Sequence, residues 1–87
     1  MATADADLKK RYQAAVELTH ARHAVWTAAL SNVTSADAAA FNGKGSGATE
    51  EQMDAEDRAR LAYEAALDDE DELRRLVKAA SGAAGAA

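Results

Sequence analysis

Apolar residues recur every three or four positions between residues 7 and 33, and this spacing narrows the possible folds more than any other feature. Such steps place side chains on one face of an α-helix, which turns by about 100° per residue. We therefore predict a helix over residues 7–33, capped at its start by Asp5 or Thr3. The predicted apolar face consists of Leu8, Tyr12, Ala15, Thr19, His23, Trp26, Leu30 and Val33, widened by Val16, Leu18, Val25 and Ala29.

A second helix is predicted over residues 50–80. Thr49 and Gln52 have the spacing of a capping box, in which each side chain bonds the backbone N–H of the other residue. Arg74, Arg75 and Lys78 suit the carbonyl end, and Gly82 is predicted to stop the helix. Its small residues leave room for Trp26 and Leu30 of the first helix. The predicted buried seam consists of Ala55, Ala59, Ala62, Tyr63, Ala66, Leu73, Leu76 and Val77.

The segment between the two helices contains three glycines within residues 42–48, which discourage regular structure. It is not a phosphate-binding loop, because the Gly-Lys-Ser/Thr order is missing and no strand precedes it. Asn42 and Gly43 suit the turn of a β-hairpin, but the flanking residues have low strand propensity. A flexible loop, or a short extension of the first helix through Phe41, is the preferred interpretation.

The composition predicts a thin core. Of the 87 residues, 25 are Ala, against seven Leu, four Val and no Ile. At roughly 25 cal/mol per Å² of buried apolar surface, set against about 1.5 kcal/mol of ordering entropy per residue, one copy of such a hairpin has a stability near zero. We therefore expect a protein partner or further copies of the chain to stabilise it.

Negative charge is concentrated in the second half of the chain. Residues 1–47 carry five Lys/Arg and four Asp/Glu, whereas residues 48–87 carry five and eleven, giving a net charge of -5. An acidic surface repels phosphates, so nucleic acid is not expected as a partner.

The acidic run 68–72 lacks the alternating ligands and central Gly of a calcium loop, and it is interpreted as a solvated face. Its Glu70 nevertheless falls at an inward position, so either the helix bends there or its end projects beyond the first helix. Acid–base pairs four residues apart are predicted at Asp54/Arg58, Glu56/Arg60, Glu70/Arg74 and Asp71/Arg75.

Compartment signals favour a soluble intracellular, cytoplasmic protein or a virion component. The chain has no Cys, which excludes disulfides and thiolate metal sites. Its first residues alternate Ala with Asp and lack a signal peptide, and no apolar run is long enough for a membrane span. No membrane association and no secretion by a signal peptide are expected.

One set of residues suggests metal chemistry. Glu17, His20 and His23 are spaced three apart, and a Glu-x-x-His step occurs in di-iron helical bundles. On the predicted helix, however, Glu17 and His20 lie on the polar strip while His23 borders the apolar face, so the three side chains diverge. We therefore expect no metal, no cofactor and no catalytic residue, and we predict that the protein is not an enzyme.

The segment Tyr12–Glu17, with the order Tyr-x-Ala-Ala-Val-Glu, lies early in a short acidic, Ala-rich chain with a Gly-containing middle and a charged second helix. In this outline the chain resembles the small head-completion or head–tail joining proteins of tailed phages, over residues 8 to 78. The resemblance implies two helices flanking a β-hairpin and a structural role in a ring between the portal and the next connector. The middle of this chain departs from that pattern because it lacks strand residues, and no functional residue is carried over.

Together these features predict an all-α, two-helix hairpin, with residues 1–6 as an N-terminal arm, 7–80 as the domain and 81–87 as an Ala/Gly tail. We expect it to act by packing against other protein, as a homo-oligomer or in a larger assembly. The alternative is an acidic regulatory module, like an antitoxin or an inhibitor, that occupies a basic site on its target. The predicted interface residues are Leu8, Tyr12, Trp26, Leu30, Tyr63, Leu73, Leu76 and Val77.

Overall fold

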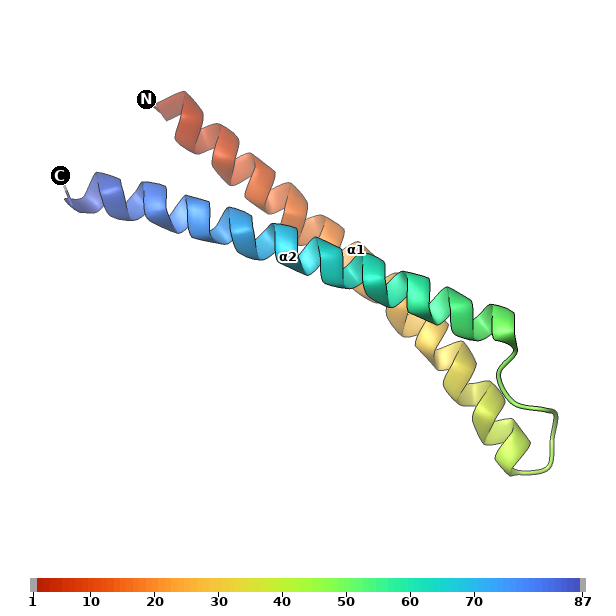
Figure 1. Ribbon diagram of the computed structural model, residues 1–87. Coiled ribbons are helices and arrows are strands. Elements are labelled where there is room, and N and C mark those ends of the chain that lie inside the picture. The colour runs from red at the N-terminus through yellow and green to blue at the C-terminus, as the bar shows by residue number, and fades with distance from the viewer. Residues whose placement is uncertain (1, 87) are drawn as a thin grey trace.

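The chain folds into two long helices joined by one connector, α1 (Ala2–Phe41) and α2 (Glu50–Ala86) (Figure 1). This computed structural model describes the backbone of residues 2–86 and the side chains of residues 6–82. The helices run antiparallel, and the described backbone contains no strand. The predicted all-α helical hairpin is therefore confirmed.

Both helices are longer than predicted. Helix α1 begins at Ala2, so the predicted start at residue 7 with a cap at Asp5 or Thr3 is wrong. It continues to Phe41, so the extension through Phe41 is confirmed in preference to an end near Val33. Helix α2 continues to Ala86, and the predicted stop at Gly82 is wrong. Gly82 lacks the positive φ of a C-terminal cap, and a Cβ built there would meet no atom within 4 Å. The backbones of 2–6 and 81–86 thus continue the helices; Met1 and Ala87 lie outside the described residues.

Helix α1 ends in a Schellman motif. The N–H of Lys44 bonds the carbonyl of Ala39 at 2.7 Å, and the N–H of Gly43 bonds that of Ala40 at 3.0 Å. Gly43 has φ +78°, the left-handed conformation that this motif requires at its glycine. The connector then closes on α1, because Asp37 Oδ1 accepts the N–H of Ala48 at 2.9 Å. The connector is an ordered turn and contains no β-hairpin.

The predicted capping box opens α2. Thr49 Oγ1 accepts the N–H of Gln52 at 3.0 Å, and Gln52 Oε1 accepts the N–H of Thr49 at 2.9 Å. Glu50 and Glu51 follow in the first turn, where negative charge opposes the positive end of the helix. Both ends of the connector are therefore fixed by local bonds that the sequence specifies.

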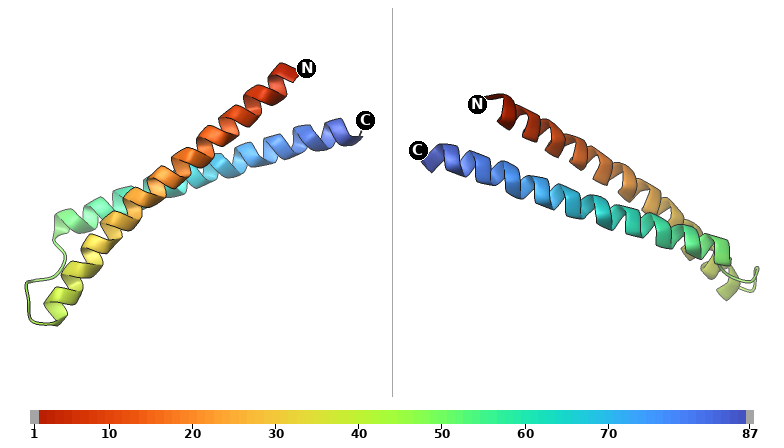
Figure 2. Two further views of the ribbon diagram at one scale, coloured as in Figure 1. Left: turned by 180° about the vertical axis from the view of Figure 1, so that it is seen from behind. Right: turned by 45° about the horizontal axis from the view of Figure 1, so that its top comes forward.

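The less exposed side chains form one seam along each helix, with steps that alternate between four and three residues, as in an antiparallel coiled coil. The seam consists of residues 8, 12, 15, 19, 22, 26, 29, 33, 36 and 40 on α1 and residues 52, 56, 59, 63, 66, 70, 73, 77 and 80 on α2. Arg22 is the one exposed residue among these seam positions. The helices cross, and their N- and C-terminal ends diverge (Figure 2).

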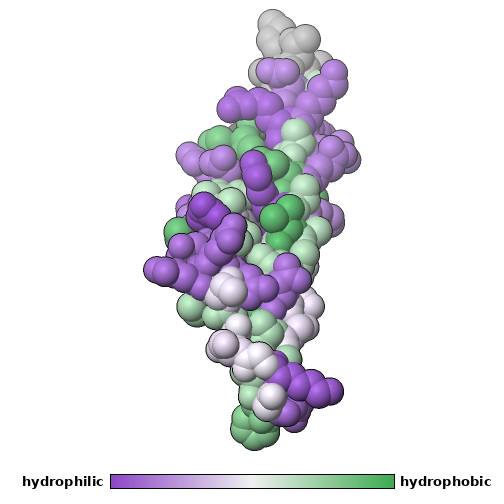
Figure 3. All heavy atoms as spheres, turned by 90° about the vertical axis from the view of Figure 1, so that its right-hand side faces the viewer, coloured by the Kyte–Doolittle hydropathy of each residue, from purple (hydrophilic) through white to green (hydrophobic). Residues whose placement is uncertain are grey.

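The hairpin is a thin rod with a small core. It extends 66 × 18 × 13 Å with a radius of gyration of 19.3 Å, against about 12 Å for a compact domain of this length. Among residues 6–82, Ala66 is the one buried hydrophobic residue, and the buried polar residues are Thr19 and Glu70. Hydrophobic and hydrophilic side chains mix on the surface at the connector end (Figure 3). Large hydrophobic side chains are at least 40% exposed at Leu18, Val25, Leu30, Phe41, Met53, Leu61 and Leu76.

Candidate functional site

Aromatic side chains join the middles of the two helices. The Trp26 and Tyr63 rings stack with centroids 5.4 Å apart and planes 16° apart. His23, one turn before Trp26, meets both rings edge-on, at 5.0 Å from Tyr63 and 6.0 Å from Trp26. Offset stacks and edge contacts of this kind add to the free energy gained by burying area. This cluster joins α1 and α2 through the Trp26, His23 and Tyr63 side chains.

A carboxylate lies beside the aromatic cluster. Glu56 Oε2 accepts the indole N–H of Trp26 at 3.2 Å, and its Oε1 accepts Arg60 Nη1 at 3.0 Å. Arg60 also binds Asp57 at 2.6 Å, one turn back along α2. The Glu56 side chain is only 14% exposed, so these two donors satisfy a charge that would otherwise lose its hydration. The predicted Glu56/Arg60 pair is confirmed.

Thr19 binds the backbone of the opposite helix. Its hydroxyl lies 2.9 Å from the carbonyl of Ala15 in its own turn and 3.3 Å from the carbonyl of Ala66 on α2. A hydroxyl reaches a backbone carbonyl of another helix only where that helix carries a small side chain. Ala66 supplies this, and the two residues form the most buried level of the seam.

Glu70 points inward, and an arginine from the next turn pairs with it. Arg74 Nη2 binds Glu70 Oε2 at 2.7 Å, and Arg74 Nη1 binds Asp71 at 3.0 Å. Arg74 Nε donates to the Tyr12 hydroxyl of α1 at 3.5 Å. This hydrogen bond, with the charges of Asp71 and Glu70, raises the pKa of Arg74 above its ordinary value, so the guanidinium stays charged. Arg74, rather than Arg75, takes Asp71, and the predicted Glu70/Arg74 pair is confirmed.

The acidic run is therefore only partly a solvated face. Asp68, Asp69 and Glu72 are exposed, whereas Glu70 is 8% exposed. Helix α2 continues unbroken through this run, and Glu70 lies opposite α1. Neither a bend nor a projection into solvent accommodates Glu70; the Arg74 side chain does so by supplying the compensating charge.

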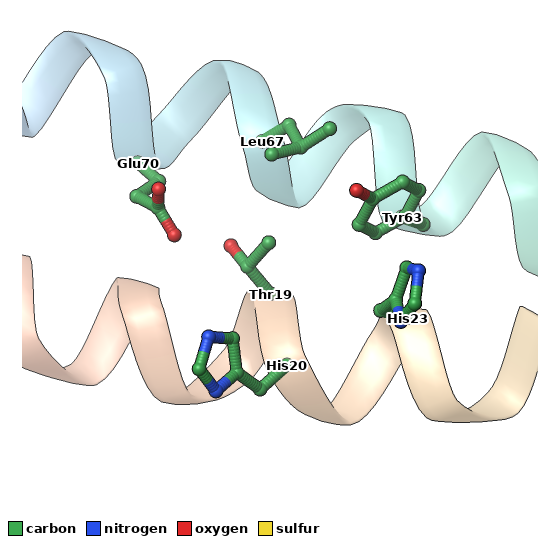
Figure 4. A pocket seen from close by; sticks show the side chains of 6 residues that line it. All are labelled: Thr19, His20, His23, Tyr63, Leu67 and Glu70. Atoms are coloured by element: carbon green, nitrogen blue, oxygen red, sulfur yellow. The ribbon is translucent and has the colours of Figure 1, made fainter.

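One flank of the seam has a hollow of about 440 Å³ beside these groups (Figure 4). Thr19, His20 and His23 reach it from α1, and Tyr63, Leu67 and Glu70 reach it from α2. Glu17, His20 and His23 were predicted to diverge, but the structure brings His20 and His23 to this hollow, and Glu17 does not line it. Within the part of the chain that the structure describes, no group of three or more His, Cys, Asp or Glu residues could hold a metal ion.

The opposite flank carries a second, less polar hollow of about 260 Å³, which we call the alanine groove. Arg22 and Val25 line it from α1, and Ala55, Arg58, Ala59 and Ala62 line it from α2. A smaller hollow of about 230 Å³ continues it toward the connector, lined by Ala29, Asn32, Glu51, Gln52 and Ala55. This flank presents alanines and a valine between two arginine side chains.

The structure divides the eight predicted interface residues into two sets. Leu30 and Leu76 are 40% and 48% exposed, so their predicted burial in the hairpin seam is wrong. The other six are partly buried between the helices, namely Leu8, Tyr12, Trp26, Tyr63, Leu73 and Val77. Tyr12 and Val77 also share a hollow of about 530 Å³ with Lys9, Gln13 and Val16. Whether these residues contact another protein stays a prediction.

The helical pattern of the sequence places Thr19 on the apolar face and Glu70 at an inward position, but it misses Glu56 as a member of the seam. Glu56 was predicted only as one half of an ion pair with Arg60. A strict alternation of four- and three-residue steps from Ala59 through Tyr63 and Ala66 leads to Glu56 on one side and Glu70 on the other. This alternation of four- and three-residue steps was the sequence signal that could have identified Glu56 as a seam residue.

Comparison of the chain with protein-family models, with curated proteins and with solved structures found no match. The β-hairpin implied by the resemblance to phage connector proteins is not present between α1 and α2. Across the described residues, neither helix combines the length and the apolar character that crossing a membrane requires.

Proposed function

We propose that this protein is a small, non-enzymatic assembly or adaptor subunit that acts by packing against other protein. One observation carries the proposal. The hairpin leaves seven large hydrophobic side chains at 40–92% exposure, while Ala66 is the one hydrophobic residue that it buries among residues 6–82. Seven large hydrophobic side chains are thus still available to a partner after the hairpin has formed.

Magnitudes favour contact with protein. Burying a Val, Leu, Phe or Met side chain contributes about 1.5–3 kcal/mol, and a single small hairpin has little net stability of its own. Burying even three of the exposed side chains against a partner would therefore contribute more free energy than the net stability of the single hairpin. Exposed apolar surface of this extent is a mark of interaction sites.

The polar seam supports a structural role. Buried polar residues in coiled coils select one register, at a cost in stability. Thr19 is matched to the Ala66 carbonyl, and Glu56 is matched to Trp26 on the other helix. The resulting 66 Å rod would present a fixed arrangement of exposed side chains to a partner. A connector subunit in a phage virion is one specific form of this role, and it rests on the resemblance of the sequence alone.

A second candidate function has its own observation. Asp68, Asp69 and Glu72 are exposed on α2, in a chain of net charge -5. These carboxylates would suit an acidic regulatory module that blocks a basic site, as an inhibitor or an antitoxin does. The inward turn of Glu70 removes one charge from that surface, which makes this the weaker candidate.

The mass of the complex that holds the chain in its own cells separates the two functions. The assembly role predicts a particle with several subunits, lost when Leu18 and Val25 are both replaced by Asp. The regulatory role predicts a one-to-one complex, lost when Asp68 is replaced by Asn and Glu72 by Gln, both exposed acids of the same run. Ala79→Asp, on the exposed side of α2, is the matched control. A chain recovered only as a free monomer would contradict both functions.

A further inference from the structure

We propose that the alanine groove binds a second copy of this chain, face to face and antiparallel, to form a four-helix bundle with twofold symmetry. This inference rests on the proposed function and names the partner and the surface. Antiparallel helices packed at small angles, with small residues at the closest approach, are the ordinary geometry of such bundles.

The groove and its rim carry exposed apolar side chains beside the arginines Arg22 and Arg58. Val25 lines the groove at 57% exposure, and Leu18, two turns earlier on the same side of α1, is 45% exposed. On α2 the lining residues Ala55, Ala59 and Ala62 project little from the helix, because their side chains end at the Cβ. A neighbouring helix can approach α2 closely there, while Leu18 and Val25 project beside it.

Charges on α2 are arranged for antiparallel pairing with another α2. Arg58, Ala62, Ala65 and Asp69 follow steps of four, three and four residues, so they share one side of the helix. All but Ala62 are exposed, and within the described residues neither Arg58 nor Asp69 forms an ion pair. A twofold axis midway between Ala62 and Ala65 brings Arg58 to the partner's Asp69, and Asp69 to the partner's Arg58. The same axis places Ala62 opposite the partner's Ala65.

The same axis also matches the apolar side chains of α1. Contacts between the helices set their relative height: Thr19 meets Ala66, and Arg22 and Ala62 line the same hollow. The axis therefore passes α1 between Ala21 and Arg22. Two antiparallel copies of α1 then place Leu18 against the partner's Val25, and Val25 against the partner's Leu18. One axis thus pairs opposite charges on α2 and exposed hydrophobic side chains on α1, as a self-complementary twofold interface requires.

The face that carries the groove is large enough for an interface, since a rod 66 Å long and 18 Å wide exceeds the roughly 800 Å² that each partner buries in a standard interface. The axis also brings Arg22, which lines the groove, close to the partner's Arg22. The Arg58–Asp69 pairs and the Leu18–Val25 contacts must outweigh this like-charge contact.

Charge reversal tests the register. In Arg58→Asp, the new carboxylate would face the partner's Asp69, and in Asp69→Arg, the new guanidinium would face the partner's Arg58. Each variant alone should weaken the dimer about tenfold or more in sedimentation equilibrium. Mixed in equal amounts, the two variants should form a heterodimer. At one of its two charge contacts the introduced carboxylate faces the introduced guanidinium, and at the other the original Asp69 faces the original Arg58. Arg75→Asp and Asp68→Arg, exposed on the outer side of α2, should dimerise like wild type.

The double variant with both reversals, Arg58→Asp together with Asp69→Arg, restores opposite charges at both contacts of its own homodimer. It should dimerise with an affinity close to that of wild type, which a general loss of folding or solubility in the single variants could not explain. Circular dichroism of each variant shows whether the hairpin is still folded.

Three results would overturn the inference. They are a wild-type chain that stays monomeric, a single reversal that leaves dimerisation unchanged, and a double variant that associates no better than the single ones. A monomeric wild type that enters a larger complex in its own cells would contradict the twofold dimer while leaving the assembly function in place.

Discussion

The indole of Trp26 lies against the phenol ring of Tyr63, with centroids 5.4 Å apart, and its N–H binds Glu56 on α2, two helical turns before Tyr63. One side chain of α1 therefore makes an aromatic contact and a polar contact with α2. Both contacts fall in the middle of the hairpin, and the most buried level of the seam, at Thr19 and Ala66, follows within two turns.

Trp26→Ala should disturb folding or assembly more than any exposed acid in the 68–72 run. Truncating a fully buried Trp costs about 3–5 kcal/mol, and the partly buried Trp26 should lose about 2 kcal/mol or more. Asp68→Ala and Glu72→Ala should change the free energy of unfolding by about 0–1 kcal/mol. Urea unfolding followed by circular dichroism measures these values. Full helicity and assembly in Trp26→Ala, together with their loss in Glu70→Ala, would contradict this and favour the regulatory role.

Ala66→Leu should separate the helices. Ala66 is 5% exposed, and its carbonyl lies 3.3 Å from the Thr19 hydroxyl, so added methylenes have no space. Overpacking of this kind costs about 1–3 kcal/mol. Ala79→Leu makes the same chemical change at an exposed position of α2 and should leave the unfolding free energy nearly unchanged. Equal midpoints for the two variants in urea would show that this level of the seam is loosely packed.

Gly47→Ala should destabilise the connector more than Gly43→Ala. Both glycines have positive φ, which costs an L residue about 1–2 kcal/mol. A Cβ at Gly47 would lie 3.1 Å from Asp37 Oδ1, the oxygen that accepts the Ala48 N–H, whereas a Cβ at Gly43 meets nothing within 4 Å. Thermal unfolding of the two variants compares them directly. A lower midpoint for Gly43→Ala would mean that the Asp37 bond contributes little.

Thr49→Ala should weaken the start of α2 by about 1 kcal/mol, because it removes the oxygen that accepts the Gln52 N–H. Ser46→Ala, earlier in the connector, is the matched loss of a hydroxyl and should be neutral. Amide hydrogen exchange of residues 50–54 reports the opening of this turn specifically. Unchanged protection there in Thr49→Ala would show that the Glu50 and Glu51 charges suffice to hold the helix start.

The isolated chain should lose helicity on dilution. Among residues 6–82 its seam buries one hydrophobic residue, Ala66, so a single copy gains little to offset the chain entropy. Association by mass action should therefore raise its stability. Circular dichroism melts over a roughly hundredfold range of concentration measure this. A cooperative melt above about 70 °C that does not shift with concentration would show that the monomer is stable by itself.

The sequence by itself determined the parts of this protein that depend on local geometry. Helical period, capping residues and glycines predicted two helices and their connection, because a cap such as Thr49/Gln52 is complete within three residues of chain. The same locality predicted the Glu56/Arg60 and Glu70/Arg74 pairs, which form. Within residues 6–82, the predicted Asp54/Arg58 and Asp71/Arg75 pairs do not form. The end of α2 was misjudged at Gly82, because a glycine permits a helix to stop without requiring it to do so.

Only the tertiary structure decided which side of each helix faces the other. An apolar stripe on an Ala-rich helix is broad, and a rotation of about 100° about the helix axis exchanges Leu76 for Val77 or Asp69 for Glu70 at the seam. The cross-helix contacts of Trp26 with Tyr63 and of Thr19 with Ala66 fix that rotation, and both join residues far apart in the chain. Leu30 and Leu76 were left exposed for this reason, and Glu70 was buried beside Arg74, since burial depends on what the opposite helix brings to each level.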